Sequence, residues 1–546
     1  MRSFSLLSLA IVVAVGCQTT SKTEETPLYY QIGDVHMDVS TQSNEAQLWF
    51  DRGLALTYGF NHEEAIVCFE RVTEIDPGCA MAYWGIAYAA GPNYNNTEMS
   101  PETTAAAYDA LQSAIGAALR VTPVERDLID ALRARYPSRE PSPRPPIEAA
   151  YAAEMRKVFA NHPDNEHVAA LTAESLMMLK PWKLWSPEGE PADVVTEIRA
   201  VLEPSLERWP DHPALCHLYI HAMEAGPEVE KALPAARNLE ALTPGLGHLI
   251  HMPSHIYVWT GRYEDVIRTN VEAVDVDDAY VLHGGRHNFY TLYRLHNHHF
   301  VAYGAMWDGQ SELALEYARK LVTEIPEDYL MEAIDFLDIF VATPYHVMIR
   351  FGMWDQILAE PEPADELLAT RAVHHYARGV ALAALGRVDE ALAEQQKFAD
   401  ARASVPSTRL LFNNAVSDIL AVADQVLAGE IAYRAGNHDE AFAHLRRAVE
   451  LDKRLNYDEP WGWMEPARHA LGALLTEQGR YEEALAVYAA NLARYPNNGW
   501  ALHGMAECQR ALELVEQAAE SERQFKKVWA RADIEIPGSC FCRTDS

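Results

Sequence analysis

Residues 46–77, AQLWFDRGLALTYGFNHEEAIVCFERVTEIDP, carry the clearest helical pattern in the chain. Two small residues, Gly53 and Ala65, stand 12 positions apart and would let two helices approach closely. Phe69 would then fill the gap to a following unit, and Pro77 would end the second helix because proline has no backbone N–H to donate. The segment therefore predicts two packed helices that leave an apolar face for a neighbouring unit.

Landmarks of this kind recur along the chain. Trp49, Gly53, Ala65, Phe69 and Pro77 at these offsets resemble the tetratricopeptide repeat, whose unit of about 34 residues consists of two antiparallel helices. The same separation of glycine and alanine recurs at Gly379/Ala391, Gly429/Ala441 and Gly472/Ala484. The resemblance implies an all-α fold, a tetratricopeptide-type superhelix or α-solenoid, over residues 46–530.

Prolines that close one unit set the start of the next. If a unit begins three residues after a closing proline, as Ala80 follows Pro77, later units start at Glu166, Pro213, Gly247 and Gly499. Glycine and alanine spacing places further starts near Leu295, Asp338, Ala372, Val422 and Glu465. Segments that do not fit a repeat are expected as inserts near 97–146, 180–191 and 277–294, and residues 531–546 as a tail.

The first 17 residues have the features of a cleaved export signal. Arg2 precedes an apolar run from Phe4 to Val15 that is too short to span a bilayer. The ending Ala-Val-Gly-Cys17 resembles the lipobox of bacterial lipoproteins, which implies acylation of Cys17 and anchoring in the cell envelope, in the periplasm or at the outer membrane. Residues 18–45 would then be a tether. The alternative is an ordinary signal peptide in which the cysteine has no role.

The charge balance limits the partners of this chain. It has 546 residues, with 45 lysines and arginines against 79 acidic residues and a net charge of -34. Such a chain repels nucleic acids and anionic lipid headgroups. We expect no nucleic-acid partner, and contact with a membrane only through the lipid anchor.

Histidines gather in four consecutive units. The resemblance implies that the second, fifth and ninth residues of each first helix face the concave groove, and offsets of three and four place side chains on one helix face in any case. Histidine holds eight of the twelve such positions in these units: His217, His221, His248, His251, His255, His296, His299 and His346. The enrichment predicts a transition-metal site, with copper or zinc favoured and iron as an alternative.

Within that set, His217, His221, His251 and His255 are the primary candidate ligands, and the other four are further or second-site ligands. Pro253 lies between His251 and His255 and should kink or restart the helix. The kink either separates these two imidazoles or tilts them toward a common point.

Two carboxylates accompany the histidines in the predicted register. Glu174 holds the ninth place of the unit that starts at Glu166, and Glu224 follows His221 by one helical turn. If the site is catalytic, these are the candidate general bases beside a metal with an open coordination position.

The tail carries a separate signal, Cys540-Phe541-Cys542. Two thiolates one residue apart suit a soft ion such as Cu(I). The alternative is a pair of cysteines without a role.

Three functions are consistent with these features. The first is a lipid-anchored metal-binding protein, and the sequence leaves open whether it is an enzyme. The second is a scaffold at the cell envelope that binds a protein or peptide partner in its groove without a metal. The third is metal storage or transfer, in which the cysteine tail would matter more than the carboxylates.

Overall fold

The computed structural model describes residues 26–543. Cys17 and the predicted signal peptide lie outside the described residues. Among the helices within them, none is both long and apolar enough to cross a membrane. The described part is almost entirely helical, with one short hairpin of β1 (Leu410–Leu411) and β2 (Asn414–Ala415). The predicted all-α helical-repeat fold is confirmed.

Helices adjacent in the sequence pack as pairs along the whole chain. In the first half the pairs are α1 (Asn44–Tyr58) with α2 (His62–Ile75), α3 (Ala80–Ala89) with α4 (Pro101–Ala117), α5 (Pro123–Arg135) with α6 (Arg144–Asn161), α7 (Glu166–Met177) with α8 (Val195–Arg208), and α9 (Pro213–Met223) with α10 (Leu233–Leu239). In the centre, α11 (Gly247–His251) and α12 (Pro253–Trp259) pack on α13 (Tyr263–Gly284), and α14 (Thr291–Asp308) packs on α15 (Ser311–Glu324).

The second half continues the same arrangement. Short helices α16 (Glu327–Glu332), α17 (Ile334–Leu337) and η3 (Asp338–Ala342) lead into α18 (Thr343–Arg350) and α19 (Trp354–Ala359). The remaining pairs are α20 (Leu368–Ala384) with α21 (Val388–Ser404), α22 (Val416–Arg434) with α23 (His438–Asp452), α24 (Ala467–Glu477) with α25 (Tyr481–Arg494), and α26 (Gly499–Ala511) with α27 (Val515–Val528).

Glycines allow the helices of successive units to meet around one aromatic ring. A Cβ at Gly53 or Gly85 would stand 2.7 Å from the ring of Phe69. At the other end of the chain, a Cβ at Gly472 or Gly504 would stand 2.5 or 2.3 Å from the ring of Tyr488. These distances are too short for any side chain, so the ring of one unit packs against bare backbone in its own unit and the next.

The prolines predict correctly where the first helices of several repeat units begin. Helices α3, α7, α9, α11 and α26 begin at Ala80, Glu166, Pro213, Gly247 and Gly499, the residues at which units are predicted to start. Where no proline fixes the start, the boundaries move: α14 begins at Thr291 rather than near Leu295. The segment 277–294 is also not a plain connection, since its first part continues α13 to Gly284.

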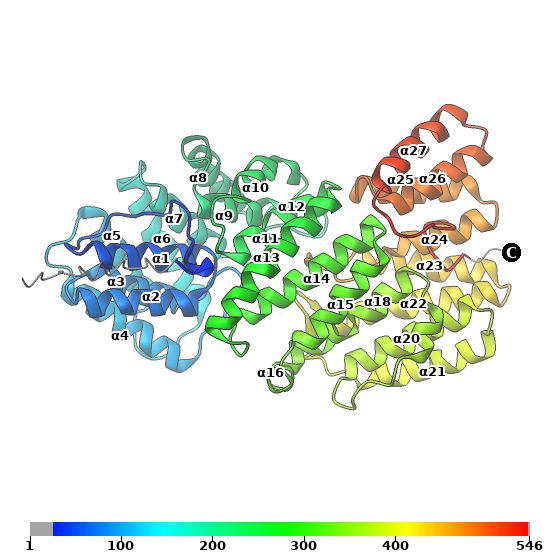
Figure 1. The fold of residues 1–546 in the computed structure, drawn as a ribbon, viewed down its shortest axis with the longest axis horizontal. Helices are drawn as coiled ribbons and strands as arrows, with labels where there is room; N and C mark the ends of the chain where they lie inside the picture. The colour runs from blue at the N-terminus through cyan, green and yellow to red at the C-terminus, as the bar shows by residue number, and fades with distance from the viewer. Residues whose placement is uncertain (1–25, 544–546) are drawn as a thin grey trace, which may run out of the picture.

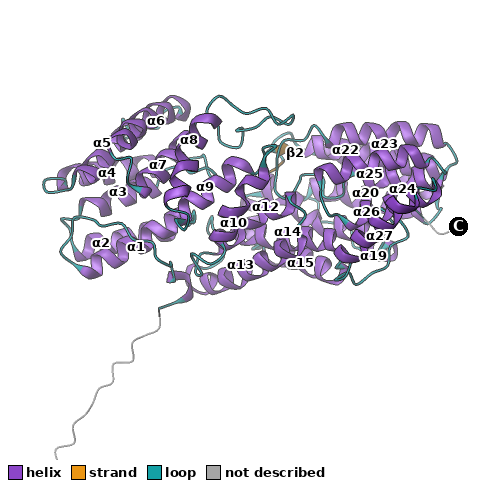
Figure 2. Cartoon of the chain, turned by 90° about the horizontal axis from the view of Figure 1, so that it is seen from above, coloured by secondary structure: helices purple, strands orange, loops and turns teal. Residues whose placement is uncertain are grey.

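The central helices lie between two groups of helices. Figure 1 shows α1 to α8 at one end, α20 to α27 at the other, and α13 and α14 between them, and Figure 2 shows the same order from above. The C-terminal units fold back onto this centre. Trp500 Nε1 donates a hydrogen bond to the backbone oxygen of Met306 at 2.9 Å, and the Tyr263 hydroxyl donates to that of Pro496 at 3.1 Å.

Candidate metal centre

Four central helices carry six histidines into one buried region. The histidines are His217 and His221 on α9, His248 and His251 on α11, His255 on α12, and His296 on α14. Proline at the first position of α9 and α12 suits a helix start, where a backbone N–H has no partner within the helix. The first five side chains are at most 2% exposed, so loops cover the concave face that the repeat geometry alone would leave open.

The first set consists of His217, His221 and His248, whose candidate ligand atoms lie within 4.8 Å of one another. His217 Nδ1 donates to the backbone oxygen of Tyr58 at 2.8 Å, so its Nε2 keeps the lone pair. That lone pair faces His248 Nε2 at 3.2 Å. His221 Nε2 is buried and makes no hydrogen bond with any described residue.

The second set consists of His251, His255 and His296, again within 4.8 Å. The amide nitrogen of Asn270 donates to the backbone oxygen of Val266 at 2.7 Å, which leaves its oxygen to accept from His251 Nδ1 at 2.6 Å. His251 Nε2 therefore keeps its lone pair and faces His255 Nε2 at 2.7 Å. A proton or a cation must lie between two such nitrogens, because their lone pairs repel.

Glu224 connects the two sets. Its Oε1 accepts from His221 Nδ1 at 3.0 Å and its Oε2 from His255 Nδ1 at 2.7 Å. An acceptor on one ring nitrogen fixes the imidazole and leaves the other nitrogen free, as in metal-binding histidines. Glu224 was predicted as a candidate general base. The structure instead gives both of its oxygens to imidazoles, so it orients one histidine of each set.

Burial sets the protonation state of the centre. It lowers the pKa of His217, His221, His248, His251 and His296 well below the usual value, with neighbouring imidazoles adding to the effect. These rings are therefore neutral at pH 7, the form that binds metals. Burial also raises the pKa of Glu224 and Glu459, and for Glu224 the charge of Glu459 adds to it.

A cavity of about 230 Å³ adjoins the second set. His248, His255, His296 and Glu459 form part of its wall, and Glu459 also contacts His255 Nδ1. Each of the three predicted inserts contributes to the wall, with Thr97, Trp182 and Phe289 respectively. Loops 405–415 and 453–466 of the C-terminal half add Phe412 and Asp458.

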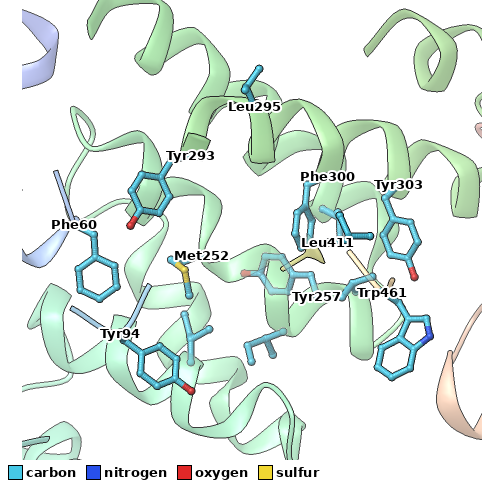
Figure 3. Packing of buried hydrophobic residues seen from close by; sticks show 14 of the residues in the cluster. Phe60, Tyr94, Met252, Tyr257, Tyr293, Leu295, Phe300, Tyr303, Leu411 and Trp461 are labelled. Carbon is cyan, nitrogen blue, oxygen red and sulfur yellow. The ribbon is translucent and has the colours of Figure 1, made fainter. Parts of the chain in front are cut away.

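Side chains from distant parts of the chain pack around this cavity and the histidines. Figure 3 shows Phe60 and Tyr94 from loops of the first half, and Leu411 from β1 and Trp461 from a loop of the second, in one cluster with Tyr293 of α14. Two loops of the first half, together with β1 and a loop of the second, thus contact one central region.

Strained backbone is concentrated here. Of five non-glycine residues with positive φ in the described part, three are aromatic residues that contact these histidines: Phe60 (φ 55°), Trp182 (φ 58°) and Phe412 (φ 45°). Their ring centroids lie 4.6 Å from His217 for Phe60, 5.7 Å from His221 for Trp182 and 5.4 Å from His296 for Phe412. Bulky residues adopt this conformation only where the surroundings impose it, and such positions are concentrated at functional sites.

Other predicted site residues lie elsewhere. Glu174 accepts a hydrogen bond from the Tyr88 hydroxyl and is not part of either histidine set. Its position follows from α7, which lies one unit before the first histidine helix. His299 Nε2 is 3.5 Å from the Met464 sulfur, and His346 Nδ1 is 3.0 Å from Glu465. Burial lowers the pKa of His299 to about 3.

The two tail cysteines form a disulfide in the structure, between Cys540 and Cys542. The Cu(I) site at these cysteines stays a prediction, because ligand atoms of Glu430, Cys540 and Cys542 lie within 4.8 Å of one another. The sulfurs lie beside Glu430 rather than beside the central histidines.

Sequence analysis missed several residues that shape the centre, above all Glu459, Asn270 and Phe412. Glu459 lies in the segment Asp458-Glu459-Pro460, within a connection between α23 and α24 that is longer than a repeat turn needs. Its length and its acidic, proline-containing composition were the available signal. Asn270 and Phe412 had none, because nothing local distinguishes them.

Comparison with known proteins identifies the repeats. Family models of the tetratricopeptide repeat match residues 46–79, 423–497 and 475–521. No curated protein matches the chain.

Among solved structures, similarity is to other helical assemblies. A Rap protein complexed with competence and sporulation factor is 11% identical, with a TM-score of 0.33, covering 67% of this chain and 99% of that one. A human IFIT1 dimer with m7Gppp-AAAA is 10% identical, with a TM-score of 0.30, covering 91% and 92%. Scores this low add nothing on function. The chain therefore contains tetratricopeptide repeats at residues 46–79 and 423–521, within a fold of paired helices.

Proposed function

We propose that the protein binds two transition-metal ions, copper or zinc in preference to iron, at its two sets of three histidines. His217, His221 and His248 would hold one ion, and His251, His255 and His296 the other. Imidazole nitrogens suit these metals, whereas calcium and magnesium require oxygen ligands.

The observation that carries this proposal is the direction of the ring nitrogens. In both sets a hydrogen-bonded Nδ1 leaves an Nε2 lone pair facing another imidazole. Two nitrogens bound at about 2.1 Å to one tetrahedral ion lie about 3.4 Å apart. The His217–His248 separation of 3.2 Å fits this value, and the His251–His255 pair at 2.7 Å would open by about 0.7 Å.

The charge of the region supports the same proposal. Glu224 and Glu459 are buried beside His255, and no lysine or arginine of the described residues lines the adjoining cavity. Buried carboxylates without a basic partner are costly. Metal cations would balance their charge and favour their ionised forms.

The surrounding residues also suit chemistry on a bound molecule. A bound metal ion would supply a Lewis acid or a redox centre. Glu459 lines the cavity, and its Oε1 has no hydrogen-bond partner among the described residues, so it can accept a proton from a ligand. Phe336, Phe340 and Phe412 in the same wall lower the local polarity, which strengthens electrostatic interactions inside.

Elemental analysis of protein purified without an affinity tag tests the proposal. We expect about two equivalents of copper or zinc after incubation with both, since there are two ligand sets. His217→Ala should remove one ion and His251→Ala the other. His469→Ala is the control, because this buried histidine lies outside both sets. Less than about one tenth of an equivalent in the wild type would overturn the proposal.

A second candidate is a scaffold without a metal. Tetratricopeptide folds are protein-interaction modules, and the repeat matches show that the chain has this scaffold. The central histidines are buried under loops, so a peptide partner would have to bind on another face. Metal storage or transfer, the third predicted function, needs no cavity beside the histidines, so the cavity favours a centre that acts on a small molecule.

We also propose that Cys17 anchors the protein in the cell envelope, as the sequence of residues 1–17 predicts. Cys17→Ser should release the protein from membranes, because one acylated cysteine would supply the attachment. If the variant still fractionates wholly with membranes at high salt, the anchor is wrong.

A further inference from the structure

We propose that the cavity beside the second histidine set binds a small neutral phenol, with its ring among the apolar side chains and its hydroxyl group at Glu459. The role of this ligand as a substrate rests on the proposed metal centre, whereas its binding does not.

The size of the cavity defines the size of the ligand. Its volume of about 230 Å³ exceeds the roughly 150 Å³ of an apolar cavity that binds benzene. It is smaller than pockets for drug-sized ligands, which begin at about 300 Å³. One aromatic ring with a small substituent fits between these limits.

The apolar part of the cavity wall determines where the aromatic ring of the ligand lies. Phe336, Phe340 and Phe412 line one side and contact one another, with ring centroids 5.2 to 5.6 Å apart. Leu295 and Leu337 also line the cavity. Such a surface favours an aromatic ring, which packs edge-to-face on other aromatic rings.

Charge excludes most other ligands of this size. Among the described residues no lysine or arginine lines the cavity, so a carboxylate or phosphate would find no positive partner there. Asp458 offers little to a cation, because its oxygens already accept from the Asn413 backbone nitrogen at 2.8 Å and the Asn414 amide at 2.5 Å. The lining therefore excludes anions, and an uncharged ligand avoids the cost of burying a further charge beside Glu459.

Glu459 determines where the hydroxyl group of the ligand lies. Its side chain is 3% exposed and lines the cavity, and its Oε1 makes no hydrogen bond with a described residue. A buried acceptor without a partner is costly, so a ligand that donates a hydrogen bond here recovers that cost. His255 and His296 line the same cavity, so the hydroxyl group would lie at the histidine end.

Titration calorimetry with phenol, benzene and benzoate tests this proposal on metal-free protein and again on metal-loaded protein. In the metal-free protein we expect saturable binding of phenol, binding of benzene weaker by about tenfold because it lacks the donor, and no binding of benzoate. In the metal-loaded protein a bound cation would give benzoate a partner, so only the preference for phenol over benzene is expected to persist. Absence of phenol binding in both forms, or equal binding of all three compounds, would overturn the proposal.

Variants locate the binding. Leu337→Trp should fill the cavity and reduce phenol binding at least tenfold, whereas Leu385→Trp, the same substitution at a residue 43% exposed, should not. Glu459→Gln should narrow the difference between phenol and benzene in metal-free protein. Thermal unfolding checks that each variant is folded. If a variant does not fold, the comparison of phenol, benzene and benzoate binding to the wild-type protein still tests the proposal. Phenol binding unchanged in Leu337→Trp would place the ligand elsewhere and overturn the proposal.

The two proposals fail separately. Metal content without phenol binding would refute the phenol site alone. Phenol binding to a protein that takes up no metal would refute the metal centre alone.

Discussion

The central units and the C-terminal units use the same repeat positions differently. In the unit of α24, the fifth position holds His469, whose Nε2 donates to Asn491 at 2.9 Å. Asn498 also donates to that oxygen, at 2.6 Å, which fixes it as the acceptor. In the units that start at Pro213 and Gly247 the fifth positions hold His217 and His251, which face other histidines. A repeat position therefore becomes a ligand position only where neighbouring units present ligands toward it.

The two regions also differ in what covers them. In the C-terminal units the ring of Tyr488 packs tightly against the bare backbone of Gly472 and Gly504. In the centre, loops from both halves of the chain close over the concave face and leave a cavity. The C-terminal units are thus packed by rings against bare glycine backbone, whereas the centre combines buried histidines and carboxylates with strained aromatic residues.

Among the substitutions that distinguish the two regions, Glu224→Gln should have the largest effect, a loss of metal affinity. The amide can accept only one of the two hydrogen bonds, and its NH₂ group would oppose an imidazole N–H. We expect metal affinity to fall by about 10- to 100-fold, measured by competition with a chelator. Glu174→Gln is the control, because Glu174 contacts Tyr88 and neither histidine set. Equal losses in both variants would contradict the assigned role of Glu224.

A second prediction concerns stability in the C-terminal units. Gly472→Leu should force Tyr488 out of its place and cost about 1–2 kcal/mol, since a Cβ would already stand 2.5 Å from the ring. Denaturant unfolding measures the loss, and metal content should not change. Gly116→Leu is the matched control in α4, where a Cβ meets nothing within 4 Å. If limited proteolysis began in the central units rather than near α24, the regions would not be separable.

The smallest expected effect is the pH dependence contributed by His469. Burial lowers its pKa well below the usual value, and Arg350 adds to this. Below about pH 6.5 the unfolded chain takes up a proton that the folded chain does not, so stability is lost as pH falls. His469→Gln should remove about 1 kcal/mol of that loss at pH 5.5, measured by urea unfolding at pH 7 and 5.5. If the free energy of unfolding depends on pH equally in the variant and the wild type, His469 is protonated in the folded protein.

Much of the architecture could be predicted because it is local. Glycine at Gly53 and Gly472 and proline at Pro210 and Pro244 act on their own helix or the next, so their spacing gives the helix pairs and most starts. The start of α14 could not be predicted, because no proline precedes it. Even so, His296 lies in the second set, because a helix start shifted by four residues keeps each side chain on nearly the same helix face.

The sequence by itself predicted a helical repeat and eight histidines on one face, six of which the structure brings together in the two sets. Helical periodicity predicts the helices because it depends only on residues a few positions apart, and the resemblance to the repeat family implies that their histidines share one groove. The tertiary structure decided how those histidines divide into two sets, and that Glu224 orients them while Glu174 does not. Contacts such as His217 with Tyr58, 159 residues away, fix the ring nitrogens. Those contacts exist only after the solenoid has folded over its own concave face.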